Sequence, residues 1–315
     1  MTTAQELMDV QSARLATLDE ALPSSYLLPH RGEPLMARLA DGTEVAGLMA
    51  HTSHPPGSLQ RLWSATENYE LFPLLGEHPR AGMDALLDSW RRQLSQREIT
   101  AADSSAVVTW PSRDVDATRA LLDHGFAPLT CLAVRPAAPA KYTKLSGTVK
   151  TRRAGTDDLD AVVELALAEL NYAALVGGSV LRGDAETLKR NAARVRLHTT
   201  GRTGSEPVWL AERDGEPIGL AECGWTDTET HPGQHRLASG RWGYVNCLSV
   251  REQERGTGIG SLLTALAHDE FARAGVVGSY LYYNPANPLS SVFWPRQGYR
   301  PLWTVWEMRP ATALR

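Results

Sequence analysis

The sequence predicts a mixed α/β protein with a mixed sheet, built from two similar domains in tandem. A chain of 315 residues is long enough for about two domains, and 43% hydrophobic residues can supply a core to each. The second half of the chain alternates strand-like and helical segments, an order that requires a crossover between parallel strands. We expect the domains at 1–138 and 148–315, with a linker of small residues, proline and lysine at 139–147.

The strongest sign of a duplication is a repeated pair of landmarks. Asp41-Gly42 and Asp214-Gly215 each stand between two apolar stretches, which is a hairpin signal. Gly125 and Gly298 each end a short helical pattern and precede an aromatic residue. Gly125 lies 84 residues after Asp41, and Gly298 lies 84 residues after Asp214. Two independent landmarks at one spacing indicate an internal repeat with an offset of about 173 residues.

The elements of the second half follow from apolar periodicity and from the residues that punctuate it. Apolar alternation predicts strands, a 3.6-residue period predicts helices, and Thr156 or Asp157 is the expected cap of the first helix. The predicted order is a strand at 148–154, helices at 157–175 and about 184–194, a hairpin at 207–225, a strand at 242–250, a glycine turn into a helix at 262–275, a strand at 276–283, a short helix ending at Gln297 and a strand at 302–310. In the first half, a helix over about 4–19 has no assigned role.

Composition limits the possible partners. A formal net charge of −4 argues against a nucleic-acid binder. The N-terminus lacks the apolar segment of a signal peptide and no apolar run reaches about 18 residues, so we expect a cytoplasmic protein that does not enter a membrane. Cys131, Cys223 and Cys247 lie in apolar runs without metal-ligand spacing, which predicts buried reduced thiols and no metal site.

The segment Arg255–Ser261, Arg-Gly-Thr-Gly-Ile-Gly-Ser, stands between a strand and a helix. A helix start leaves backbone N–H groups without partners and carries the positive end of the helix dipole, so it can bind phosphate. Arg255 would add a charge-assisted hydrogen bond. The spacing of the glycines matches neither the dinucleotide fingerprint nor the nucleotide-triphosphate P-loop.

Two motifs resemble those of the GNAT superfamily of N-acetyltransferases, over about residues 148–309. The first is a Leu-x-Val strand, Leu248-Ser249-Val250, followed by Arg-x-x-Gly-x-Gly at a helix start. The second is Asn-x-x-Ala-x-x-apolar-Tyr-x-x-x-Gly-Phe, which here begins at Asn287, has Phe293-Trp294 in its middle and ends at Gly298-Tyr299. The resemblance implies a fold of two tandem GNAT-like acyl-CoA N-acyltransferase domains.

The resemblance also implies a donor site for acetyl-CoA or another acyl-CoA. The pantetheine would lie along Leu248, Ser249 and Val250 like an added strand, and a backbone N–H near Leu248 would polarise the thioester carbonyl. Asn287 would reach the pantetheine or the thiol. The pyrophosphate would lie on Arg255, Gly256, Thr257, Gly258, Ile259, Gly260 and Ser261.

The first half carries a degenerate version of these motifs. Arg80 aligns with Arg255 if a slip of about two residues is allowed, but Ala81, Met83 and Ala85 replace the three glycines. Asp114 stands where Asn287 stands. We therefore expect the first domain to be a scaffold that shapes the acceptor cleft.

The implied reaction is transfer of an acetyl group from acetyl-CoA to a primary amine of a small molecule or a peptide N-terminus, by direct attack on the thioester, in a monomer or homodimer. In the family, a tyrosine of the second motif often acts as the acid and an acidic residue on the Leu-x-Val strand often acts as the base. In this chain, Trp294 and Asn246 stand at these two positions.

Several residues could substitute for the missing acid and base. Glu222, a carboxylate among apolar strand neighbours, is the candidate base, and Tyr282, with Tyr280 and Tyr283 beside it, the candidate acid. Glu222, Asn246 and Tyr282 are thus the candidate catalytic residues. The loop residues His231 and His235 could relay a proton, whereas His268 is expected on the helix surface. A non-catalytic acyl-CoA-binding protein and an acyltransferase to a hydroxyl or carrier thiol remain alternatives.

Overall fold

The computed structural model describes residues 3–26, 28–140, 142, 148–199, 206–230 and 236–314. The predicted relays His231 and His235 and most of the predicted linker lie outside these residues. The helices are α1 (Ala4–Ala16), α2 (Pro79–Ser95), α3 (Val115–Asp123), α4 (Leu159–Leu175), α5 (Ala185–His198), α6 (Ile259–Arg273) and α7 (Ser290–Arg296). The strands are β1 (Glu33–Arg38), β2 (Glu44–Ser53), β3 (Glu67–Leu74), β4 (Ser104–Pro111), β5 (Ala127–Pro136), β6 (Lys150–Arg153), β7 (Val208–Arg213), β8 (Glu216–Asp227), β9 (Arg241–Val250), β10 (Gly278–Tyr283) and β11 (Arg300–Met308).

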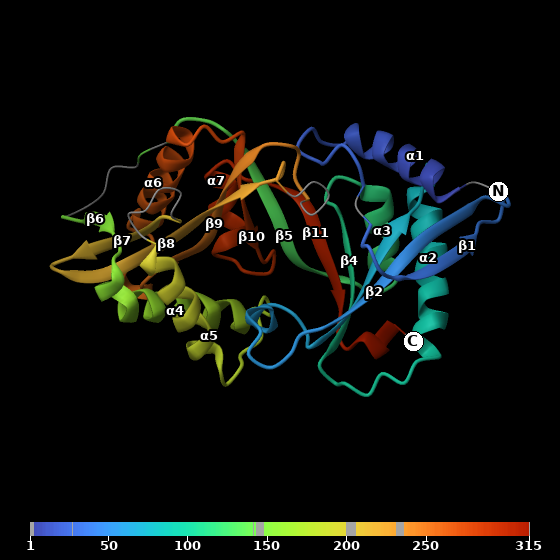
Figure 1. Ribbon diagram of the computed structural model, residues 1–315, viewed down its shortest axis with the longest axis horizontal. Coiled ribbons are helices and arrows are strands. Elements are labelled where there is room, and N and C mark those ends of the chain that lie inside the picture. Colours follow the sequence, from blue (N-terminus) through green and yellow to red (C-terminus); the bar gives the residue numbers. More distant parts are fainter. Residues whose placement is uncertain are drawn as a thin grey trace.

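All these strands lie in one sheet, which is mixed, as predicted. Its order is β1-β2-β3-β4-β11-β5-β10-β9-β8-β7-β6. The pairs β3·β4 and β9·β10 are parallel, and the other pairs are antiparallel. The sheet runs through the whole molecule, with β5 and β11 side by side in its middle (Figure 1).

Apart from β6, which lies at one end and has no counterpart among the described strands, the strand order reads the same from both ends when each strand of the first half is matched to one in the second half. In chain order, β1 to β5 correspond to β7 to β11. At the centre, Thr304 of β11 pairs with Cys131 of β5, which is the residue 173 positions earlier in the chain. The pairs on either side, Trp303↔Leu132 and Val305↔Thr130, exchange with each other under the same offset, as an approximate two-fold relation centred on Thr304 and Cys131 would require.

The last strand of each half lies inside the other half's part of the sheet. β5 has β11 and β10 as neighbours, and β11 has β4 and β5. Every hydrogen-bonded neighbour that β5 has in the sheet therefore comes from the second half of the chain. The two halves share a continuous sheet through this exchange.

Most local predictions agree with the structure to within a few residues. The β7–β8 turn has positive φ at Asp214 (53°) and Gly215 (87°), as a tight hairpin turn with a right-handed strand twist requires. Helix α4 begins at Leu159, after a 3₁₀ turn whose Asp158 carboxylate accepts from the Gly155 N–H, rather than at a Thr156 or Asp157 cap. Helix α5 continues beyond its predicted end, to His198. No helix of the described ranges has both the length and the apolar character needed to cross a bilayer.

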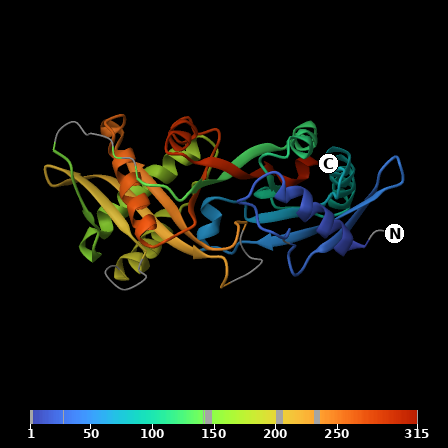
Figure 2. The same ribbon diagram turned by 90° about the horizontal axis from the view of Figure 1, so that it is seen from above.

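Helices cover both faces of the second half of the sheet (Figures 1 and 2). Alternate strand residues face opposite layers, so Leu220 of β8 packs in the core under α4 and α5, whereas Ala221 packs with Ile259 and Leu263 of α6. By the same alternation, Cys247 of β9 lies on the α4 face.

Strands β9 and β10 part before they end. Their parallel register runs from Trp242↔Gly278 to Val245↔Leu281, although β9 continues to Val250. On its other edge, β9 stays paired with β8 as far as Val250. In the part of the chain that the structure describes, the β10-facing edge of residues 246–250 therefore has no strand partner, and a cleft opens there.

Candidate functional site

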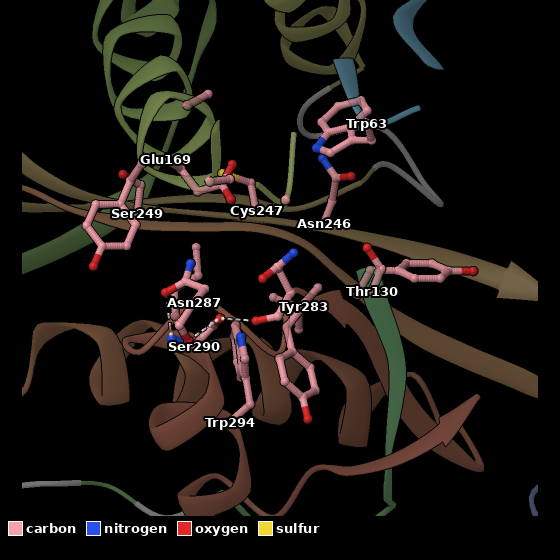
Figure 3. Close-up of a pocket in the computed structure, with 18 of the residues that line it drawn as sticks. Trp63, Thr130, Glu169, Asn246, Cys247, Ser249, Tyr283, Asn287, Ser290 and Trp294 are labelled. Carbon is pink, nitrogen blue, oxygen red and sulfur yellow. Dashed lines mark hydrogen bonds between the residues drawn. The ribbon is translucent and has the colours of Figure 1, made fainter. Parts of the chain in front are cut away.

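The cleft between β9 and β10 has a volume of about 980 Å³, which is within the range of ligand-binding pockets. Figure 3 shows Asn246, Cys247 and Ser249 of β9 on one side of it, and Asn287, Ser290 and Trp294 on the other. Glu169 projects toward it from α4. Trp63 and Thr130, which belong to the first half of the chain, also line the cleft, so both halves form its walls.

The glycine turn leads from β9 into α6 at one end of the cleft. Gly256 and Gly258 have φ of 78° and 94°, a region that favours glycine, and Gly258 is the N-cap residue of α6. The first helical hydrogen bond runs from the Leu262 N–H to the Gly258 carbonyl (3.0 Å), so the N–H groups of residues 258–261 have no partner within the helix. The guanidinium of Arg255 lies over the Tyr172 ring of α4, 5.1 Å from its centroid. The arrangement is suited to an anionic group.

On the other wall, Asn287 holds the start of α7. Its Oδ1 accepts from the N–H groups of Leu289 (3.0 Å) and Ser290 (3.2 Å). The side-chain NH₂ of Asn287 is left to donate to a ligand in the cleft.

The structure brings almost all predicted site residues to this one cleft. Thr257 is the exception: it does not line the cleft, and its hydroxyl donates to the Glu254 carbonyl (2.7 Å) within the turn. The predicted residues that do line the cleft are Glu222, Asn246, Leu248, Ser249, Val250, Arg255, Gly256, Gly258, Ile259, Gly260, Ser261, Tyr282 and Asn287.

Glu222 and Asn246 form one polar group with Arg196 of α5. Glu222 is buried, accepts from the Asn246 Nδ2 (2.9 Å) and forms an ion pair with the Arg196 Nη1 (3.2 Å). Burial lowers the pKa of Arg196, but the negative charges of Glu222 and Glu206 raise it by more. The net shift is upward, so the guanidinium stays charged. The Glu222 carboxylate is thus engaged by both Asn246 and Arg196.

The tyrosines of β10 differ in their surroundings. Tyr280 is buried, stacks on Tyr244 and shares a hydrogen bond of 2.7 Å with the Thr226 hydroxyl. Tyr282 is 48% exposed and faces the cleft. Tyr283 also lines the cleft, and burial raises the pKa of its phenol to about 12. Tyr282 and Tyr283 are thus protonated donors at the cleft, whereas Trp294 is packed in the core beside Tyr299.

Several cleft residues were not identified from the sequence, among them Glu169 and Tyr172 of α4 and Lys189 of α5. The Lys189 Nζ lies 4.7 Å from the centre of the Trp63 ring. The signal for Glu169 is its place on the helix: it follows Ala166 by three residues and precedes Ala173 by four, and both alanines are buried. A carboxylate within the apolar stripe of a helix is the signal that could have identified Glu169 as a candidate site residue.

In the first half, α1 occupies the position that corresponds to the cleft. β3 leaves β4 after the pair Leu71↔Val108, and the next free backbone groups bond to the wholly buried side chain of Gln11. The Gln11 Nε2 donates to the Pro73 carbonyl (2.9 Å), and its Oε1 accepts from the Leu75 N–H (2.7 Å). Pro73 and Leu75 lie two and four residues past Leu71, the last residue of β3 that pairs with β4. In the second half, Cys247 and Ser249 lie at the same distances past Val245, the last residue of β9 that pairs with β10.

Two further features distinguish the first half of the chain from the second. Arg14 of α1 forms an ion pair of 2.8 Å with the buried Asp114, the residue that aligns with Asn287. Helix α2 begins at Pro79, so Ala81, Met83 and Ala85 lie inside a helix rather than in a turn. The first half therefore presents no glycine turn and no open strand edge at this position.

His268 corrects a prediction, because it is buried rather than on the surface. Its Nε2 lies 3.0 Å from the Tyr299 hydroxyl, which is 2.9 Å from the Ser279 hydroxyl. The three cysteines are unpaired and buried, as predicted. In the described part of the chain, no group of three or more His, Cys, Asp or Glu side chains is placed to hold a metal ion.

A comparison with protein families finds a match for the part of the chain that contains β9 and the glycine turn. Residues 204–301 match the family model described as "Acetyltransferase (GNAT) domain". A comparison with curated proteins found no match.

Two solved structures resemble nearly the whole chain. A GCN5-related N-acetyltransferase from Sphaerobacter thermophilus is 16% identical, with a TM-score of 0.52 over 90% of this chain and 83% of that one. A GNAT-family acetyltransferase from Colwellia psychrerythraea is 14% identical, with a TM-score of 0.51 over 96% of each chain. At this identity the likeness concerns the fold. The stretch that matches the GNAT acetyltransferase domain, residues 204–301, contains the glycine turn and the free edge of β9.

Proposed function

We propose that the protein transfers an acetyl group from acetyl-CoA to a primary amine, on a small molecule or a peptide N-terminus. The observation that carries this proposal is the parting of β9 and β10 next to the start of α6. It offers an unpaired strand edge and a phosphate-binding helix start within one cleft of suitable volume. The GNAT match over residues 204–301 supports a thioester donor.

In this proposal the pantetheine runs along the free edge of Leu248–Val250, and the pyrophosphate lies on the turn Arg255–Ser261. The N–H groups of residues 258–261 and the Arg255 guanidinium supply the hydrogen bonds and the positive charge. Asn287 donates to the pantetheine arm through its Nδ2. A β9 N–H near Leu248 stabilises negative charge on the thioester oxygen during attack.

We further propose that the chain holds two GNAT-like copies, 1–138 and 148–315, of which only the second binds acetyl-CoA. The symmetric strand order supports the duplication. The Gln11 side chain on the corresponding edge of β3, and the absence of a glycine turn, support a first copy without a donor site. The first copy would then contribute the acceptor side of the cleft through residues such as Trp63 and Thr130.

Calorimetric titration of acetyl-CoA into the full chain tests the donor site. We expect about one equivalent to bind, and Ser261→Glu to weaken binding at least about tenfold, because it places a negative charge where the pyrophosphate would lie. Ser261 lines the cleft and lies in the first turn of α6, where a glutamate suits the helix. Ala81→Glu is the matched control, because Ala81 is exposed in the first turn of α2.

Each outcome has a distinct meaning. Unchanged binding by the Ser261→Glu variant would remove the pyrophosphate from this turn. Two equivalents in the wild-type protein would mean that the first copy binds acetyl-CoA. Binding without thiol release in the presence of amines would favour the alternative of a non-catalytic acyl-CoA-binding protein. The specific observation that favours this alternative is that Trp294 and Asn246 replace the usual acid and base.

A further inference from the structure

The cleft is lined by five carboxylates, and four of them are ion-paired with an arginine. The pairs are Glu70–Arg236 (2.8 Å), Glu222–Arg196 (3.2 Å), Glu254–Arg213 (2.8 Å) and Glu307–Arg309 (2.8 Å). Among the described residues, no hydrogen bond or ion pair is present at the fifth carboxylate, Glu169. Glu169 is thus the carboxylate of this cleft that is free to bond to something else.

The position of Glu169 is set by the core of the second half. Helix α4 packs on β8 and β9 through residues such as Val162 and Ala166, and Glu169 is one helical turn beyond Ala166 on that face. Figure 3 shows its side chain descending toward β9 near Cys247 and Ser249. Both residues belong to the stretch of β9 whose β10-facing edge is free.

The surroundings of Glu169 favour its neutral form. Burial raises the pKa of this carboxyl, the nearby charge of Glu222 adds to the rise, and the ammonium of Lys189 opposes it. A carboxylate with a raised pKa is, once ionised, a stronger base than a surface glutamate.

We propose that Glu169 is the general base that takes a proton from the acceptor amine; this inference rests on the proposed acetyl transfer. The amine nitrogen attacks the thioester carbonyl carbon, the C–N bond forms and the C–S bond breaks. One nitrogen-bound proton passes to the Glu169 carboxylate, and the leaving CoA sulfur receives a proton from solvent, directly or through Tyr282, which solvent then reprotonates. The products are an amide and CoA, and Glu169 returns its proton to solvent. Glu222, paired with Arg196, is then a positioning residue that holds Asn246.

The test compares Glu169→Gln with Glu186→Gln in the full chain. Glu186 is an exposed residue of the neighbouring helix α5, pairs with Arg190 and does not line the cleft, so it is a matched control for the same chemical change. Acetyl-CoA binding is measured by calorimetry. Thiol release from acetyl-CoA is measured from pH 5 to 9 with tyramine, spermidine and glycinamide as probe amines, and with water alone.

We expect Glu169→Gln to lower kcat at least about 100-fold with each probe that reacts, and to leave the Kd for acetyl-CoA within about twofold. The rise of kcat/KM with pH that reports ionisation of Glu169 should disappear, and Glu186→Gln should behave as wild type. A Glu169→Gln variant with the wild-type rate and pH profile would overturn the assignment. Equal losses of rate and of acetyl-CoA affinity would also overturn it, because they would place Glu169 in donor binding.

A second measurement does not depend on the acceptor. The infrared carbonyl band of a protonated carboxyl should persist in the wild-type protein to a higher pH than for surface glutamates, and should be missing from Glu169→Gln. Absence of such a band from the wild-type spectrum would contradict the proposed state of Glu169. Failure of the proposed function is distinguishable, because it would show as the absence of acetyl-CoA binding in the wild-type protein.

Discussion

The imidazole of His268 lies in the core between α6 and the sheet, where its chemistry differs from that of a surface histidine. Burial, together with the positive charge of Arg135, lowers its pKa to about 3. The folded protein therefore binds a proton at this site less readily than the unfolded chain, whose histidine has a pKa near 6.5. The stability that this histidine contributes is complete above about pH 6.5 and is lost as the pH falls from there toward about 3.

His268→Gln should remove this part of the acid sensitivity. Glutamine keeps a hydrogen-bonding group near the Tyr299 hydroxyl but does not titrate. Urea unfolding between pH 7 and pH 5 should show a smaller loss of stability in the variant than in the wild-type protein. At most, the single group changes the unfolding equilibrium constant about tenfold per pH unit. His198→Gln, at an exposed position of α5, is the control; the same pH dependence in all three proteins would contradict the prediction.

Residue-level prediction from the sequence succeeded where the backbone itself determines the chemistry. The positive φ angles at Gly256 and Gly258 follow from a glycine turn before a helix, and the sequence shows such a turn directly. Side chains whose roles depend on partners far along the chain could not be predicted in this way. Glu222 and Glu169 are both carboxylates beside apolar residues. Only the fold shows that Glu222 pairs with Arg196, whereas Glu169 has no such partner among the described residues.

At the scale of elements, α1 has a role that its sequence did not reveal. Its hydrophobic positions predict a helix, but its buried Gln11 bonds to backbone groups at the end of β3 and just after it, more than 60 residues away. An amide side chain can satisfy both a carbonyl and an N–H, as a peptide strand or a pantetheine arm does. Helix α1 thus closes the strand edge in the first half, at the position that stays open in the second half.

Gln11→Ala should destabilise the protein by about 2–4 kcal/mol, because it leaves a buried carbonyl and a buried N–H without partners. Gln5→Ala, at an exposed position of the same helix, makes the same chemical change and should cost less than about 1 kcal/mol. Urea unfolding of both variants measures the difference. Similar losses in the two variants would mean that Gln11 does not bond to β3 as described.

The hairpins, the glycine turn and most helices could be predicted because local periodicity and turn residues determine them. The exchange of β5 and β11 could not, because either strand could equally have paired within its own half. At the scale of the whole molecule, the predicted repeat of 173 residues implies two similar units but does not say how they would join. The central pair Cys131↔Thr304 joins the two halves of the chain through β5 and β11, the last strand of each half.

This exchange predicts that neither half folds as a monomer when it is expressed alone. In a fragment of residues 148–315, β11 loses both its neighbours, β4 and β5, and β10 loses β5. In a fragment of residues 1–138, β5 loses both of its neighbours, β11 and β10. Each fragment would expose a long apolar strand and part of its core, which costs more than the few kcal/mol by which a domain is stable.

Size-exclusion chromatography with light scattering, combined with circular dichroism, tests this prediction on three samples: each fragment alone and the two expressed together. We expect the pair to form a folded 1:1 complex that binds acetyl-CoA as the intact chain does. The fragment 148–315 alone should be unfolded or aggregated, or should form a homodimer in which two copies of β11 replace the β5–β11 pair. Such a homodimer is possible because the central pair relates equivalent strands. A folded monomer of 148–315 that binds acetyl-CoA would show that β5 is not needed to hold β10 and β11, and that the continuous sheet is not required for the donor site.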